Sequence, residues 1–266
     1  MEQTLYATLG DSLLESGRTR TPIPALTAQH PDLTVEDAYR VQLHQVDSWI
    51  AQGRRVIGFK VGLTSKAMQR MLKVDSPDFG HLFDDMLLDP VQPIDIDRFI
   101  SPRIEPEISF VLKRDLTGPG LTVVDAIAAI DYAVASIEVI DSRIADWKIG
   151  LADTIADNAS SGALILGTRS IRLDEVDLSL LGSVVTKNGT VVSTGAGGAV
   201  LGHPVNGLLW LANQLGTLGR SLPSGSIIMA GSMSGAVPVA PGDRITATFA
   251  RLGTVSARFA SDKETS

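Results

Sequence analysis

The apolar positions of residues 1–55 recur with the period of helices. The clearest case runs from Thr34 to Gly53, where apolar side chains are spaced three or four residues apart. Thr34 and Asp37 have the pattern of a capping box, and Gly53 suits a C-terminal cap. We therefore predict an N-terminal helical region over residues 1–55, with the proline-containing segment 21–24 as a linker or packing arm. The apolar stripe expected on the clearest helix is Val35, Ala38, Tyr39, Leu43, Val46, Trp49 and Ile50.

Beyond residue 55 the pattern changes to short apolar runs, which are typical of strands. Such runs predict strands at 55–63, 104–113, 133–140, 162–166, 226–230, 244–250 and 254–260. Asn188 and Gly189 separate two further runs and predict a tight β-hairpin over residues 184–193. The same pattern predicts a loop at 75–85 and helices at 65–72, 123–131 and 204–218. The chain is therefore expected to be of the α+β class, with a strand-rich body over residues 56–262.

Composition narrows the classes of function. The 266 residues include no cysteine, which excludes disulfides, thiolate metal sites and a cysteine nucleophile. The net charge of -7 and the lack of a basic run argue against a nucleic-acid partner. The first residues lack the pattern of a signal peptide, and no apolar stretch approaches the length of a membrane span. We therefore expect a soluble, cytoplasmic protein without a membrane partner.

Three glutamates lie in apolar runs that are predicted to be strands. Glu105 and Glu107 alternate along one run and should point to the same face, and Glu138 lies in the next predicted strand. Carboxylates inside apolar strands are costly unless something pairs with them, and a divalent cation such as Mg²⁺ or Mn²⁺ would do so. Spacing alone does not choose between such a metal site and an exposed sheet face with solvated glutamates.

Three other polar residues also allow two interpretations each. Lys60 stands in a strand-like run between two glycines. It is either a buried acid, base or carboxylate anchor, or an edge-strand lysine that discourages aggregation. Asp78 follows a proline, as in a turn, but could be a general acid or base on an active-site loop. Ser160 lies in the polar run 157–161, which is either a cap and turn or presents this hydroxyl to a ligand.

Other patterns carry less chemistry. Asp141 and Arg143 could pair with each other or support a metal ligand, and their pairing is the favoured interpretation. His203 is expected to help start the helix at Pro204 and not to bind a metal. The glycine-rich segment 195–198 lacks the Gly-Lys-Ser/Thr ending of a phosphate-binding loop. The chain has no Gly-x-Ser-x-Gly motif, which disfavours a serine-triad hydrolase.

Several motifs, in this order along nearly the whole chain, resemble those of the 2-oxopent-4-enoate hydratases, also called 2-hydroxypenta-2,4-dienoate hydratases. That group belongs to the fumarylacetoacetate hydrolase superfamily, together with the similar 4-oxalocrotonate decarboxylases. The motifs are Gly-Phe-Lys-Val-Gly-Leu-Thr-Ser-Lys at 58–66, Ser-Pro-Asp-Phe-Gly at 76–80, Pro-Arg-Ile-Glu-Pro-Glu-Ile at 102–108, Glu-Val-Ile-Asp-Ser-Arg-Ile-Ala-Asp-Trp at 138–147, Asp-Thr-Ile-Ala-Asp-Asn-Ala-Ser at 153–160 and Leu-Gly-His-Pro-Val-Asn at 201–206.

The resemblance implies a fold, a cofactor and a set of site residues. The fold would be the family's mixed β-roll or sandwich body over residues 56–262, beside the helical region 1–55. The cofactor would be Mg²⁺ or Mn²⁺, held by the glutamates at positions 105, 107 and 138. The implied catalytic residues are Lys60, Asp78 and Ser160. The resemblance also implies a small 2-hydroxydienoate or 2-oxo acid substrate, a homo-oligomer, and association with another enzyme of an aromatic meta-cleavage pathway.

Two reactions of the group compete. Asp78 in Pro-Asp-Phe-Gly is similar to the hydratases, and we expect an apolar residue there in decarboxylases. The segments 195–204 and 236–243 are more similar to the decarboxylases, and the loop 231–235 departs from the usual hydratase loop. The expected reaction is hydration of 2-hydroxypenta-2,4-dienoate to 4-hydroxy-2-oxopentanoate. Decarboxylation of 2-oxohex-3-enedioate (4-oxalocrotonate) is the alternative, and both are lyase reactions.

Overall fold

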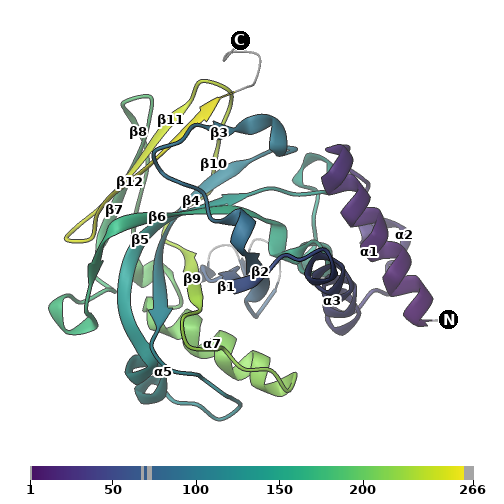
Figure 1. The fold of residues 1–266 in the computed structure, drawn as a ribbon, viewed down its shortest axis with the longest axis horizontal. Helices are drawn as coiled ribbons and strands as arrows, with labels where there is room; N and C mark the ends of the chain where they lie inside the picture. Colours follow the sequence, from purple (N-terminus) through teal and green to yellow (C-terminus); the bar gives the residue numbers. More distant parts are fainter. Residues whose placement is uncertain (1, 67–68, 71–73, 261–266) are drawn as a thin grey trace.

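The computed structural model describes residues 2–66, 69–70 and 74–260 (Figure 1). The helices of the described residues are α1 (Glu2–Thr19), α2 (Leu26–Gln29), α3 (Val35–Ala51), α5 (Val123–Ala129), α6 (Leu151–Ala156) and α7 (Pro204–Thr217). The strands are β1 (Val56–Gly62), β2 (Asp78–Phe83), β3 (Ile94–Asp95), β4 (Arg103–Leu112), β5 (Ile130–Ile140), β6 (Ser161–Ile171), β7 (Gly182–Lys187), β8 (Thr190–Ala196), β9 (Ile227–Ser232), β10 (Val237–Pro238), β11 (Arg244–Phe249) and β12 (Gly253–Ala260). Much of the helix predicted at 65–72 lies outside the described residues.

Two β-sheets make up the body of the protein. The larger sheet has the order β2-β1-β9-β4-β5-β6, with β10 paired to β4, and the smaller has the order β3-β12-β11-β7-β8. Strand β12 packs against β5 and β6, so the two sheets share a core. Helices α1, α2 and α3 lie on one side of the body, and α5 and α7 lie below the larger sheet (Figure 1). The prediction of an α+β fold with mixed sheets is confirmed.

Helix α3 begins as the sequence predicts, and its buried face is wider than the predicted apolar stripe. Thr34 caps its first turn, because its hydroxyl accepts from Asp37 N and the Asp37 carboxylate accepts from Thr34 N. The middle of the stripe is largely buried, whereas its end residues Val35 and Ile50 are 42% and 49% exposed. Gln42 is also buried, and its amide donates to the carbonyls of Phe79 and Ile155. The helix therefore holds β2 and α6 through buried amide groups.

The prediction of a loop over residues 75–85 is wrong, because β2 occupies most of it. All six residues of β2 are buried, and the strand pairs antiparallel with β1. Lys60 lies opposite Gly80 and Gly62 opposite Asp78 in this register. The bend that Ser76 and Pro77 predict is present but ends before the strand begins. Asp78 is therefore the first residue of a buried strand and not part of an active-site loop.

Several local predictions hold. Asn188 and Gly189 have φ angles of 53° and 82° in the turn between β7 and β8, as a tight hairpin requires. His203 caps α7, because its Nδ1 accepts from Val205 N. No helix among the described residues is long and apolar enough to cross a membrane.

One hydrophobic core includes both Leu13 of α1 and Phe110 of β4, so the N-terminal helices pack onto the strand-rich body. The division of the chain into two domains at residues 55/56 therefore stays a proposal.

His81 of β2 is a buried histidine in an apolar environment. Its ring is 4.9 Å from the ring of Phe59, and its Nδ1 is 3.1 Å from Gln42 Oε1. Burial lowers the pKa of His81 to about 3. The folded protein therefore keeps this imidazole neutral over a pH range in which the unfolded chain protonates it.

We expect a pH-dependent stability difference between the wild type and His81→Gln. The stabilisation by neutral His81 is complete above the unfolded pKa of about 6.5 and is lost as the pH falls toward 3. The free energy of unfolding of the wild type, relative to the variant, should fall by about 2 kcal/mol between pH 7 and pH 5. Urea unfolding of both proteins at both pH values measures this, and a difference that does not change with pH would contradict it.

Candidate metal centre and active-site cavity

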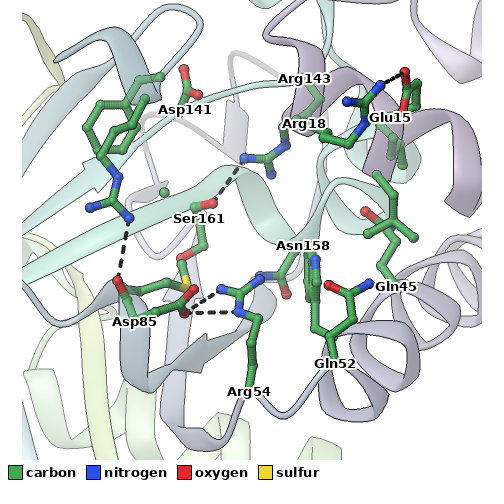
Figure 2. Close-up of a pocket in the computed structure, with 18 of the residues that line it drawn as sticks. Glu15, Arg18, Gln45, Gln52, Arg54, Asp85, Asp141, Arg143, Asn158 and Ser161 are labelled. Atoms are coloured by element: carbon green, nitrogen blue, oxygen red, sulfur yellow. Dashed lines mark hydrogen bonds and ion pairs between the residues drawn. The ribbon is translucent and has the colours of Figure 1, made fainter. Parts of the chain in front are cut away.

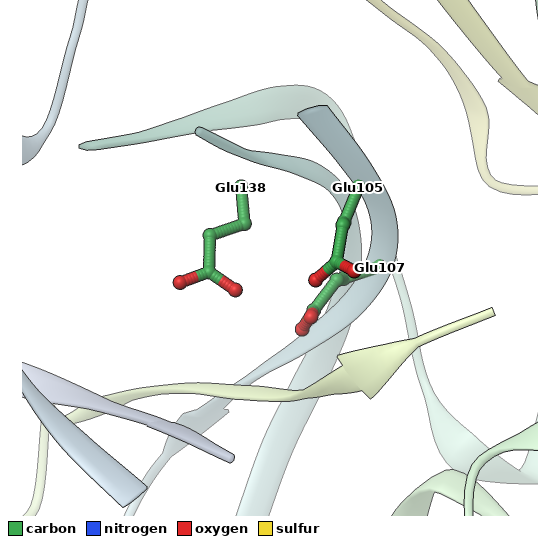
Figure 3. A group of neighbouring side chains, drawn as sticks. All are labelled: Glu105, Glu107 and Glu138. Atoms are coloured by element: carbon green, nitrogen blue, oxygen red, sulfur yellow. The ribbon is translucent and has the colours of Figure 1, made fainter. Parts of the chain in front are cut away.

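Three glutamate side chains converge between β4 and β5 (Figure 3). Glu105 and Glu107 share one face of β4 because they are two residues apart, and the strand register places Glu138 of β5 directly opposite Glu105. One carboxylate oxygen from each lies within 4.8 Å of the others. Glu107 and Glu138 are buried, at 1% and 0% exposed. The structure thus brings the three predicted ligands together, and it does not place them on an exposed sheet face.

Several oxygens of these buried carboxylates have no hydrogen-bond partner among the described residues. Burial, together with the charge of Glu138, raises the pKa of Glu105 to about 7 and raises that of Glu107 well above its usual range. Glu107 Oε2 accepts from Gly231 N at 2.9 Å, but Glu107 Oε1 and both oxygens of Glu138 have no hydrogen-bond partner in the described part of the chain. An oxygen-only ligand set with unsatisfied buried oxygens fits a hard divalent cation such as Mg²⁺ or Mn²⁺.

Lys60 lies beside this cluster and not at a sheet edge. Strand β1 runs between β2 and β9, and Lys60 is 3% exposed. Its Nζ donates to Ala159 O at 2.9 Å and is 3.3 Å from Glu138 Oε1. Burial disfavours the charged amine, but the carboxylates around it, Glu138 first, outweigh this effect and raise the pKa of Lys60. The lysine is therefore a buried ammonium group among carboxylates.

Asp78, on the neighbouring strand β2, adds a further carboxylate beside Lys60. Its Oδ2 accepts from Thr154 Oγ1 at 3.3 Å, while its Oδ1 has no partner among the described residues. Burial raises the pKa of Asp78, and the nearby charge of Lys60 opposes that rise. Gly62 makes the close approach possible, because a Cβ at that position would lie 2.2 Å from Asp78 Oδ1. Asp78 and Lys60 are thus electrostatically coupled across the β1–β2 pair.

Ser160 reaches the same site through an unusual turn after α6. Asn158, Ala159 and Ser160 all have φ angles between 51° and 53°, a region that residues other than glycine rarely adopt. The Asn158 side chain holds the turn to β2, because it accepts from His81 N and donates to His81 O. The turn aims the Ala159 carbonyl at Lys60 and places Ser160 Oγ 3.4 Å from Thr154 Oγ1. Such strain is typical of functional sites.

Three contributors to this site could not be predicted from the sequence. Thr154 lies within the motif at 153–160, but nothing in its spacing predicts its hydrogen bond to Asp78. The Ala159 carbonyl and the Gly231 N–H act through the backbone, so their residue types carry no signal. The only available hint was the position of both segments within motifs of the resembled family.

A cavity of about 620 Å³ opens over these residues. Its walls include Lys60, Asp78, Glu105 and Ser160, and also the loop 232–236 that follows β9. All predicted catalytic side chains therefore face one space that also reaches a predicted metal ligand. A small organic acid fits a cavity of this size.

A second cavity, of about 540 Å³, lies between α1, α3 and the body (Figure 2). Its arginines are largely paired within the protein, for example Arg54 with Asp85 at 2.7 Å and Arg143 with Asp157. Asp141 instead accepts from the backbone N–H groups of residues 100 and 101, so the predicted pairing of Asp141 with Arg143 is wrong. The charged side chains of this second cavity therefore have structural roles and lie away from the glutamate cluster.

Comparison with known proteins connects this site to a family. The family model described as fumarylacetoacetate (FAA) hydrolase C-terminal matches residues 55–260. A 2-hydroxypent-2,4-dienoate hydratase from Pseudomonas putida is 48% identical over 220 residues, covering 82% of this chain and 99% of that protein. A 2-hydroxyhexa-2,4-dienoate hydratase from Comamonas testosteroni is 42% identical over 260 residues, covering 97% and 98%. The solved 4-oxalocrotonate decarboxylase from Pseudomonas putida G7, complexed with magnesium and adipate, has a TM-score of 0.94 at 43% identity, covering 96% of this chain and 97% of that one.

Proposed function

The chain belongs to the fumarylacetoacetate hydrolase family, and on that premise we propose that it is a metal-dependent hydratase. The proposed reaction adds water to 2-hydroxypenta-2,4-dienoate and gives 4-hydroxy-2-oxopentanoate, in the meta-cleavage catabolism of aromatic compounds. The observation that carries the proposal is the joint placement of Lys60 and Asp78 beside the glutamate cluster. The hydratase relatives support the same reaction class.

The proposed metal ligands are Glu105, Glu107 and Glu138, and the proposed ion is Mg²⁺ or Mn²⁺. When bound, the cation would act as a Lewis acid that stabilises negative charge on the O2 oxygen of the substrate. The structural support is electrostatic, since these three carboxylates and Asp78 face the single ammonium of Lys60. A divalent cation would offset most of the carboxylate charge that Lys60 leaves uncompensated.

Lys60 and Asp78 are the proposed proton-transfer pair. The dienol loses its O2 proton and gains a proton at C5, which yields 2-oxopent-3-enoate. Water then adds its hydroxyl group at C4 and a proton at C3, so the overall change is the gain of one water. Because Lys60 and Asp78 titrate as a coupled pair, the two steps are assigned to the pair as a unit. Ser160, which lines the same cavity, is proposed to hydrogen-bond the substrate.

The direct test uses 2-hydroxypenta-2,4-dienoate generated in situ. We expect the ultraviolet absorbance of the dienol to disappear only with both protein and Mg²⁺ or Mn²⁺, with 4-hydroxy-2-oxopentanoate as the product. The second candidate function, 4-oxalocrotonate decarboxylation, is favoured by the 0.94 TM-score to that enzyme. Release of CO₂ from 2-oxohex-3-enedioate, without hydration of the dienol, would replace the hydratase proposal by this one.

Gly62→Ala should impair turnover without removing the metal. The added methyl group would meet Asp78 Oδ1 at 2.2 Å and Lys60 Nζ at 3.4 Å, so the carboxylate must move. A displacement near 1 Å is expected to lower kcat about 100-fold. Steady-state kinetics measures this, and Mn²⁺ titration should show affinity within a few-fold of the wild type. Gly182→Ala is the matched control, because its nearest atom would lie 3.9 Å away, and equal activity of both variants would contradict the prediction.

The proposal also includes a homo-oligomer, a cytoplasmic location and association with another pathway enzyme, all supported by the family resemblance. Size-exclusion chromatography with light scattering measures the assembly, and a particle of single-chain mass would overturn the homo-oligomer.

A further inference from the structure

Thr154 lies between two of the proposed catalytic side chains. Its Oγ1 is 3.3 Å from Asp78 Oδ2 and 3.4 Å from Ser160 Oγ. All three side chains line the active-site cavity, and all three are buried, with Thr154 the most exposed at 6%. Among the described residues, Thr154 is also the only hydrogen-bond partner of the Ser160 hydroxyl. Asp78, Thr154 and Ser160 therefore form a chain of three oxygen groups in the lining of the cavity.

The hydrogen bonds of this chain run in one direction while Asp78 is ionised. A carboxylate only accepts hydrogen bonds, whereas a hydroxyl has one proton to donate and lone pairs with which to accept. Thr154 therefore donates its proton to Asp78, and this bond opposes the rise that burial causes in the pKa of Asp78. Because Thr154 has no second proton, Ser160 must donate to it. Ser160 Oγ keeps only its lone pairs for a molecule in the cavity.

The two oxygens of Asp78 have different neighbours. Oδ1 lies toward Lys60, since a Cβ on Gly62 would be 2.2 Å from Oδ1 and 3.4 Å from Lys60 Nζ. Oδ1 has no hydrogen-bond partner in the described part of the chain, whereas Oδ2 accepts from Thr154. The carboxylate therefore faces the lysine with one oxygen and the two hydroxyls with the other.

A side chain of α3 ties the helix of Thr154 to the strand of Asp78. The amide of Gln42 donates to Ile155 O at 2.8 Å and to Phe79 O at 3.0 Å. Ile155 follows Thr154 in α6, and Phe79 follows Asp78 in β2. The backbones that carry the hydroxyl and the carboxylate are thus fixed relative to each other, and such fixed geometry favours proton transfer between the two side chains.

We propose that Thr154 connects Ser160 to Asp78 as a proton relay, through which Asp78 takes up the proton lost by the water that adds at C4. Ser160 touches that water and is a catalytic residue, whereas Thr154 acts through Ser160 and is a positioning residue. This inference rests on the proposed function, and within it the inference assigns the hydrogen bond of Ser160 to the second reactant, water.

The proton balance of the step is complete. One O–H bond of water breaks as the C4–O bond forms, and the electron pair of the C3–C4 double bond moves toward O2. The proton of water passes to Ser160 Oγ, the proton of Ser160 passes to Thr154 Oγ1, and the proton of Thr154 passes to Asp78 Oδ2. Each hydroxyl again holds one proton, and Asp78 holds the proton that C3 requires. The two O···O distances are long for such bonds, and catalytic hydrogen bonds commonly shorten when the substrate binds.

The test measures the two steps of the reaction separately in Thr154→Val, which removes the hydroxyl. With Mg²⁺, the variant should convert the dienol to 2-oxopent-3-enoate within a few-fold of the wild-type rate, because that step does not use the relay. Formation of 4-hydroxy-2-oxopentanoate should fall about 100-fold, with a smaller change in KM. Thr154→Ser keeps the hydroxyl and should recover most of the loss. Thr248→Val is the matched control, since it breaks an exposed hydroxyl pair of 3.3 Å between β11 and β12 and should change neither step.

A double variant distinguishes a relay from two independent roles. Ser160→Ala breaks the same relay at its other end and should show the same difference between the two steps. Thr154→Val/Ser160→Ala should then lose no more hydration than either single variant, because residues that act as a unit are not additive. Losses that multiply would contradict the relay. Mn²⁺ affinity within a few-fold of the wild type checks that each variant keeps a folded site.

The remaining outcomes separate the relay from the reaction itself. Equal losses in both steps would show that Thr154 only holds Asp78 in place, and would overturn the relay. Near-normal hydration by Thr154→Val, beside an active wild type, would overturn the relay and leave the proposed function intact. A wild type that forms no 4-hydroxy-2-oxopentanoate would instead overturn the proposed function, and the relay with it.

Discussion

Glu107→Gln is expected to abolish tight metal binding and nearly all turnover. Glu107 Oε1 has no hydrogen-bond partner in the part of the chain that the structure describes, and Oε2 accepts from Gly231 N, so the backbone holds one oxygen and leaves the other for the cluster. Changes to residues that merely support a metal ligand cost 10- to 100-fold in affinity, so loss of a ligand charge should cost more than about 100-fold for Mn²⁺. Titration with Mn²⁺ at pH 8 measures the loss.

The stability of the metal-free variant separates ligand loss from misfolding. Burial and the charges of Glu138 and Glu105 raise the pKa of Glu107, so the metal-free fold loses stability as the pH rises from the unfolded pKa of about 4.5 toward the raised folded value. Metal-free Glu107→Gln should therefore be at least as stable as the metal-free wild type at pH 8. Glu175→Gln, an exposed glutamate, is the control for the substitution itself. Undiminished Mn²⁺ affinity in Glu107→Gln would remove this residue from the ligand set.

The parts of this site that the sequence predicts are those that depend on strand alternation. Residues two apart on a strand share a face, so the convergence of Glu105 and Glu107 needs no knowledge of the rest of the fold. The position of Glu138 opposite them depends on the register of β4 and β5. A run of apolar residues predicts both strands but not their register, which packing decides.

Strand β2 shows where such reasoning fails. Ser76 and Pro77 indicate a turn, and Gly80 weakens the pattern of a strand. The strand forms because β1 pairs along it and because the Asn158 side chain bonds both backbone groups of His81. Gly80 is needed there, since a Cβ would lie 2.3 Å from the Asn158 carbonyl. These contacts join residues far apart in the sequence, so local propensity does not predict them.

The contacts of α3 show a similar limit. The capping box at Thr34 is local and is confirmed. The buried face is not local, because Gln42 and Gln45 are buried by bonds to carbonyls of β2 and α6. A glutamine in a helix is normally assigned to the exposed face. These carbonyls belong to the edge strand β2 and to the last turn of α6, where the backbone needs side-chain donors, which explains why amides and not apolar side chains lie there.

Asp78→Asn is expected to lower hydration 10²- to 10⁴-fold while the metal stays bound. The carboxylate faces Lys60 and has a free oxygen, Oδ1, in the cavity wall, but it is not one of the three clustered ligands. An amide keeps the shape and the bond from Thr154 but removes the titratable proton. Steady-state kinetics should show a lower kcat with a smaller change in KM, and Mn²⁺ affinity should stay within a few-fold of the wild type.

The same variant distinguishes the two lyase reactions. Hydration needs a proton at C5 and activation of water, and the coupled pair of Asp78 and Lys60 would supply both. Decarboxylation needs no water, because the conjugated 2-oxo group of the substrate takes up the electrons left by departing CO₂, and a cation held by the three glutamates would stabilise that negative charge. Asp89→Asn, at an exposed turn, is the control. Near-normal hydration by Asp78→Asn with metal bound would remove Asp78 from proton transfer. If instead CO₂ release from 2-oxohex-3-enedioate survives in the variant while hydration is lost, Asp78 is the residue that makes this site a hydratase.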